Sequence, residues 1–228
     1  MKPKALNDLW SIASFADVFT GPITGVVARW RVWQARRAPA FTPSTLPPSG
    51  RAKVVGDAFP VDLPLRAPFT QRGAAFWSAA VAEKHWLTET ELLKQIEIGT
   101  PWEWRVELVD SSTPAFWVSD ENGARVLVEP ANALLAIRQP VVTGHPSLQH
   151  TPELEAFLAH HGVAPARDPT IGGDRCFYEL AVEPGQRIAV WGTVSETTDV
   201  VSSGYRDASV KRKKISATWP HRVVLLAG

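Results

Sequence analysis

Residues 102–109 read WEWRVELV, an alternation of apolar and charged side chains. Successive side chains of a strand point to opposite faces of a sheet, so this stretch predicts a half-buried β-strand. Just after it, two short apolar runs, 116–119 and 124–128, flank Asp120-Glu121-Asn122-Gly123. Asn-Gly between two apolar runs predicts a hairpin, because both residues tolerate positive φ. The centre of the chain is therefore expected to be a β-sheet.

Further short strands are expected on both sides of this region, at 51–59, 76–79, 176–182, 187–194 and 222–226. Glu183-Pro184-Gly185 is a turn between two of them. One short helix is predicted after Thr151, which caps it, with Pro152 at its first position and Gly162 after its end. Short strands at regular spacing, separated by turns, predict a small barrel or sandwich with helical insertions.

The composition of the 228 residues is that of a folded protein, with 45% hydrophobic and 21% charged residues. The formal net charge of +1 gives no overall argument for a nucleic-acid partner. The single cysteine, Cys176, excludes an intramolecular disulfide and is compatible with a reducing, cytoplasmic setting. No Cys/His cluster has zinc-binding spacing, so we expect no metal, no cofactor and no RING domain.

The N-terminal 37 residues differ from the rest, because apolar residues recur there at helical spacing. Gly21-Pro22 interrupts the run, and Asp17 together with Gly, Thr and Ser makes a membrane span unfavourable. The segment is instead expected to be an amphipathic helix for peripheral contact with a membrane or a protein partner, or for packing on the body of the protein itself. Its candidate contact residues are Trp10, Phe15, Phe19, Trp30, Trp33, Arg29, Arg31, Arg36 and Arg37.

Three segments follow from this pattern: an amphipathic helical segment at 1–37, a Pro-rich linker at 38–50, and a β domain at 51–228. In the β domain, four short stretches resemble the GIDE, or BAM ("beside a membrane"), domain of mitochondrial-type ubiquitin ligases. They are 51–58 (RAKVVGDA), 64–69 (PLRAPF), 116–123 (FWVSDENG) and 178–192 (YELAVEPGQRIAVWG). They occur in the family's order and cover about residues 50–226.

The resemblance implies an OB-like β-barrel with helical insertions, acting as a recognition module next to a membrane. Family members place this domain between two membrane spans and follow it with a RING. Here the first span is at most replaced by the weak segment 9–33, and no ligase part is expected. Ubiquitin transfer is therefore not implied for this chain.

Candidate catalytic residues do not form a known motif, so no enzymatic activity is predicted. Cys176 fits a buried structural position, and Asp120 with Glu121 fits a solvated hairpin tip. His160 and His161 are adjacent on a helix and point about 100° apart, which disfavours a shared metal ion.

A second candidate surface is the basic group near the C-terminus, where a cluster can bind anionic lipid or nucleic-acid phosphate. The alternative is a solvated loop or a charged edge strand. Its residues are Arg206, Lys211, Arg212, Lys213 and Lys214.

The first hypothesis is thus a non-catalytic GIDE-like binding or scaffold module, acting beside a membrane or in a protein complex. The second is an OB-like barrel that binds nucleic acid or an anionic ligand, and the third is an enzyme whose site has no recognisable motif. Neither the partner nor the oligomeric state follows from the sequence.

Overall fold

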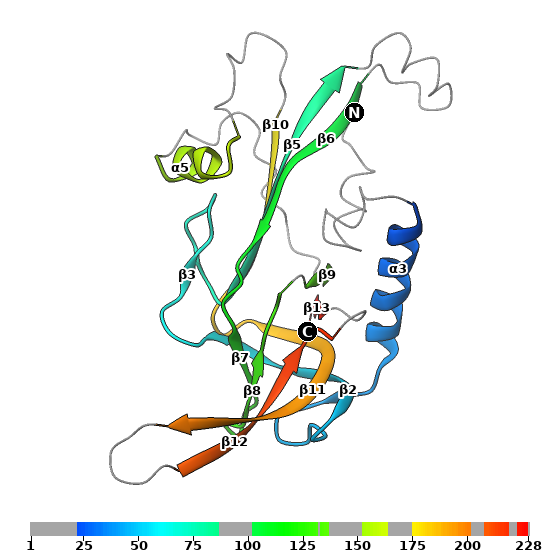
Figure 1. Ribbon diagram of the computed structural model, residues 1–228, viewed down its shortest axis with the longest axis vertical. Coiled ribbons are helices and arrows are strands. Elements are labelled where there is room, and N and C mark those ends of the chain that lie inside the picture. Colours follow the sequence, from blue (N-terminus) through cyan, green and yellow to red (C-terminus); the bar gives the residue numbers. More distant parts are fainter. Residues whose placement is uncertain are drawn as a thin grey trace.

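The computed structural model describes residues 22–86, 102–131, 133–136, 152–163, 175–201, 208–218 and 223–227. Strands dominate this part of the chain, and two helices accompany them. Figure 1 shows a barrel from which a long, narrow three-stranded sheet extends. The predicted mainly β fold with helical insertions is therefore confirmed.

Five strands close the barrel by pairing in a ring. In ring order they are β2 (Gly50–Pro60), β7 (Phe116–Ser119), β8 (Arg125–Val128), β12 (Ala208–Ser216) and β11 (Arg187–Val201), which pairs back to β2. Neighbours are antiparallel except β8 and β12, which are parallel. Inward-facing residues alternate with outward-facing ones along each strand. The barrel core includes Val54, Phe116, Val118, Val126, Ile188, Val190 and Ile215, all fully buried.

Three short strands extend the barrel sheet. They are β1 (Ala40–Phe41) beside β2, and β13 (Val224–Ala227) with β9 (Leu134–Ala136) beside β11. The segment predicted as a linker, 38–50, is part of this body, because β1 pairs with β2 and Leu46 is buried in the barrel core. An apolar side chain that inserts into the core fixes the segment in place.

The extended sheet contains β10 (Arg175–Val182), β5 (Phe76–Trp86) and β6 (Trp102–Ser111), in that order. Helix α5 (Pro152–His160) packs on it through Leu154 and Leu158. The sheet joins the barrel because β10 continues through a turn into β11, and because Phe76 and Val182 belong to the barrel core. A small hairpin, β3 (Leu65–Arg66) with β4 (Gly73–Ala74), precedes β5.

Several sequence predictions can be judged directly. The strand at 102–109, the hairpin at 120–123 and the helix ended by Gly162 are confirmed, and only Gly123 of the Asn-Gly pair has positive φ. For the basic run 211–214, one alternative was a solvated loop or a charged edge strand. The run lies instead in strand β12, which pairs with β11 along its length and with β8 from Lys213 onward. Residues 1–21 and the excursion expected at 88–98 lie outside the described residues.

Candidate binding surfaces and the buried carboxylate

Helix α3 (Pro22–Arg37) runs along one side of the barrel (Figure 1). Val32 and Ala35 are buried on its inner side. They pack against side chains on the outer surface of β11, β13 and β9, namely Trp191, Ala189, Val224, Leu226 and Leu134. The inner side of the helix therefore packs on the body of the protein, which was one of the alternatives for this segment.

The outer side of α3 exposes two tryptophans to solvent. Trp30 is 53% exposed and Trp33 is 50% exposed. The guanidinium of Arg37 lies 4.3 Å from the centroid of the Trp33 ring, within cation–π distance. Arg36 and Arg37 are exposed in the last turn, and the sequence of the helix contains no carboxylate. This side of the helix thus combines large apolar rings with positive charge.

The other predicted contact residues of the N-terminal segment are placed differently. Trp10, Phe15 and Phe19 lie outside the described residues. Arg29 and Arg31 belong to α3. Arg31 lies near Arg51, whose pKa is lowered mainly by burial and further by the charge of Arg31. The Arg51 guanidinium itself stacks over Trp191, 3.9 Å from the ring centroid, so it covers the ring where β2 meets β11.

Because side chains alternate along strand β12, the residues of its basic run point to two opposite faces of the sheet. Lys213 shares the inward parity of buried Ile215, and its Nζ donates to the carbonyl of Leu46. Lys214 points outward and forms an ion pair with Glu129, with 3.1 Å between Nζ and Oε1. Arg212 also points outward, 5.4 Å from the Trp117 ring centroid. Lys211 lies in β12, whereas Arg206 is outside the described residues. The predicted patch is therefore not one continuous surface.

The strand pairing instead creates an aromatic and basic surface on the outside of the barrel. Phe59 pairs with Trp117, Trp117 with Leu127, and Leu127 with Lys214, so these four form one row across β2, β7, β8 and β12. Arg125 lies on the same outer side of β8, two residues before Leu127. We call the set Phe59, Trp117, Leu127, Arg125, Arg212 and Lys214 the barrel face. The sequence analysis missed it, because its members come from four strands.

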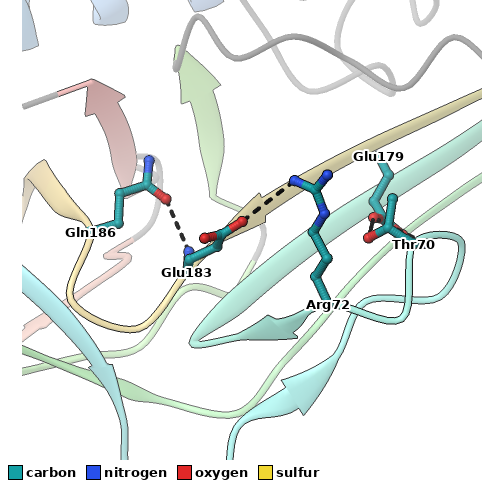
Figure 2. Close-up of polar contacts among 5 residues, drawn as sticks. All are labelled: Thr70, Arg72, Glu179, Glu183 and Gln186. Atoms are coloured by element: carbon teal, nitrogen blue, oxygen red, sulfur yellow. Dashed lines mark hydrogen bonds and ion pairs between the residues drawn. The ribbon is translucent and has the colours of Figure 1, made fainter.

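A buried carboxylate anchors the turn between β3 and β4. Glu179 of β10 is only 5% exposed and accepts hydrogen bonds from the backbone N–H groups of Phe69 (2.5 Å) and Thr70 (3.2 Å to Oε2). The Thr70 hydroxyl donates to the same carboxylate (Figure 2). These partners satisfy a group whose burial is otherwise costly. Glu179 thus holds together two stretches that the sequence analysis singled out separately, 64–69 and 178–192.

Nearby polar contacts are more exposed and contribute less. Arg72 and Glu183 form an ion pair at 3.5 Å, with both side chains more than half exposed (Figure 2). The side-chain oxygen of Gln186 accepts from the backbone N–H of Glu183 at 2.9 Å and braces the turn between β10 and β11. Exposed ion pairs of this kind typically contribute less than about 1 kcal/mol. The group of residues in Figure 2 therefore has a structural role centred on Glu179.

Asp120 organises the hairpin between β7 and β8. Its Oδ1 accepts from the N–H groups of Asn122 and Ala124, and its Oδ2 from the N–H of Ser44, each at 3.0 Å. Partial burial alone would raise the pKa of Asp120, but the hydrogen bonds from Ser44, Ala124 and Asn122 together lower it below its usual value. Asp120 therefore joins the 38–50 segment to the hairpin, in keeping with the structural role expected for it.

The adjacent histidines lie at the C-terminal end of α5, with their ring centroids 5.0 Å apart in an edge-to-face arrangement. His160 is exposed, whereas His161 is half-buried against Phe157, with its Nε2 3.2 Å from Oδ2 of Asp110. In the ranges that the structure describes, no three His, Cys, Asp or Glu side chains are grouped to hold a metal ion. No helix within the same ranges is long and apolar enough to cross a membrane.

Comparison with known proteins gives no assignment. No family model matches the chain, and no curated protein or solved structure is significantly similar to it.

Proposed function

We propose that the chain is a GIDE-like binding module that docks on an anionic membrane surface through the outer side of α3. The observation that carries this proposal is the exposure of Trp30 and Trp33 on a helix whose opposite side is packed on the barrel. Tryptophan and arginine side chains suit the boundary between headgroups and acyl chains, because their apolar parts enter it while their polar ends stay hydrated.

The charge of the helix favours a membrane surface over a protein groove. Arg36 and Arg37 follow Trp33, and the helix sequence carries no acidic residue. Each basic residue near an anionic leaflet contributes about 1 kcal/mol of attraction. A protein partner with an acidic, apolar groove is the competing occupant, and it is one outcome of the test below.

The barrel topology supports the OB-like part of the proposal. When its five strands are numbered in chain order, the ring reads 1-2-3-5-4-1, with strands three and five parallel. OB-like barrels are five-stranded Greek-key barrels of this kind. The hydrogen bonds from Phe69 and Thr70 to Glu179 also give a structural reason for two of the motif stretches behind the GIDE resemblance.

The proposal can be tested by flotation of the full chain with vesicles of phosphatidylcholine alone or mixed with phosphatidylglycerol. We expect recovery with the anionic vesicles, reduced by added salt. Trp30→Ala with Trp33→Ala should abolish most of it, and Arg36→Gln with Arg37→Gln should remove the salt-sensitive part. Substitution is a cleaner test than deletion of α3, which would uncover Trp191 and its apolar neighbours.

The matched control is Leu63→Ala, because Leu63 is 84% exposed outside the helix. This variant should float like the unmodified chain. Equal recovery of the Trp30/Trp33 variant and the Leu63 variant would refute docking through α3. Absence of flotation with every vesicle, combined with specific capture of an acidic protein that requires Trp33, would replace the membrane by a protein partner.

A further inference from the structure

The barrel face is a second exposed surface with a chemistry of its own. Phe59 is 39% exposed, and it pairs with the half-buried Trp117 on the next strand. The guanidinium of Arg212 reaches across β8 to lie 5.4 Å from the Trp117 ring. Arg125 is exposed on the strand between them. The two aromatic residues therefore lie on the neighbouring strands β2 and β7, and the two arginines on the next two strands, β8 and β12.

The six residues of the barrel face include three cations, Arg125, Arg212 and Lys214, and no carboxylate. Two carboxylates of the same strands lie close to cations: Asp57 lies 4.0 Å from Arg187, and Glu129 lies 3.1 Å from Lys214. Arg125 on β8 and Arg212 on β12 lie on the same side of Trp117, and the Arg212 guanidinium approaches the ring. A ligand that covers the face would thus meet two guanidinium groups next to two aromatic rings.

We propose that the barrel face binds single-stranded nucleic acid, with bases stacked on Trp117 and Phe59 and phosphates held by Arg125 and Arg212. Aromatic side chains stack on any base, and guanidinium groups contact phosphates or stack on bases in turn. A duplex is disfavoured, because its bases are already stacked on one another and only its backbone would meet the arginines.

The dimensions of the face suit a short stretch of single strand. Phe59 and Lys214 lie on the first and last of four neighbouring strands, so three inter-strand spacings, roughly 14 Å, separate them. Surface aromatics on a four-stranded sheet of this width stack about two or three bases in RNA-binding domains. This surface is distinct from the outer side of α3, so the inference goes beyond the membrane docking proposed above.

The test is fluorescence anisotropy of a labelled 20-nucleotide oligothymidylate titrated with the full chain at several salt concentrations. Trp117→Ala should weaken binding about 5- to 150-fold, the range expected for loss of a base-stacking contact. Trp117→Phe should restore most of the affinity, because the ring is kept. Arg125→Gln with Arg212→Gln should reduce the salt slope of log K by about 1.4, which is about 0.7 for each phosphate contact.

The matched control is Arg36→Gln with Arg37→Gln, which removes equal charge from α3. It should leave oligothymidylate binding unchanged, whereas the barrel-face variants should leave vesicle flotation unchanged. Three results would each overturn the inference: no saturable binding at low salt, equal binding of the Trp117→Ala variant and the unmodified chain at equal folded fraction, or a 20-base-pair duplex that binds as tightly as the single strand. The two assays therefore test membrane docking and nucleic-acid binding independently, and one proposal can fail while the other holds.

Discussion

Replacing Trp191 by Ala should undock α3 from the barrel and destabilise the whole protein. Trp191 is 5% exposed and lies on the outer surface of β11, where it belongs to the same cluster as Val32 and Ala35 of the helix. Arg51 covers its ring from the side of β2. The substitution removes the largest side chain of this cluster, so the helix loses its principal contact.

The expected loss of unfolding free energy has two sources, the burial of the Trp191 side chain and its contact with the Arg51 guanidinium. Truncation of a buried Trp to Ala costs about 3–5 kcal/mol of unfolding free energy. A partly exposed cation–π pair contributes about 0.5–1 kcal/mol of stabilisation. Arg51→Ala alone should therefore cost about 0.5–1 kcal/mol, and a double-mutant cycle of the two substitutions should return a coupling energy of that size.

The assay is urea unfolding followed by far-ultraviolet circular dichroism, which does not depend on the substituted fluorophore. Trp33→Ala is the control, because it removes the same side chain from the exposed side of the same helix and should cost about 0.5 kcal/mol or less. Hydrogen exchange in residues 22–37 should accelerate in Trp191→Ala and stay unchanged in the control. If both variants unfold at the same urea concentration, Trp191 does not hold α3 and the packing described here is wrong.

Three further predictions concern the buried carboxylate of Glu179, Gly56 in the barrel and Asp120 in the hairpin between β7 and β8. Glu179→Ala should cost about 2–5 kcal/mol in urea unfolding, because it leaves the buried N–H of Phe69 and the partly buried N–H of Thr70 without their acceptor, and Glu179→Gln should lose less because it keeps one oxygen. Gly56→Ala should destabilise the barrel by about 1–3 kcal/mol, since its Cβ would clash with the backbone carbonyl oxygen of Ser119, whereas Gly73→Ala, with its nearest neighbour 3.5 Å away, should have little effect on the melting temperature. Asp120→Asn should flatten the loss of stability in acid. The lowered pKa of Asp120 means that its contribution is complete above the unfolded-state pKa of about 3.9 and is lost as the pH falls through the folded-state pKa, so the melting temperatures of the variant and the unmodified chain should converge in acid.

Local sequence patterns were enough to predict the strands, turns and helix ends that depend only on neighbouring residues. The alternation at 102–109 predicted β6, the Asn-Gly pair predicted the turn before β8, and Pro152 with Gly162 marked the ends of α5. The end of α3 at Arg37 coincides with the predicted end of the helical segment, just before the proline-rich stretch. Each of these features depends on residues within one turn or one strand, so the printed order of residues is enough to find it.

The contacts between distant segments depend on long-range strand pairing, because no local sequence pattern indicates which strands become neighbours. A loop or an edge strand was one alternative for the basic run 211–214, but β12 pairs with β11 along the run and with β8 from Lys213 onward. The resulting alternation directs Lys213 toward Leu46 and Arg212 toward Trp117. The barrel face, the Glu179 anchor and the burial of one side of α3 all join residues far apart in the chain. By itself, the amino-acid sequence determined which segments form strands and helices, and only the closed ring of strands decided which side chains meet on its surface.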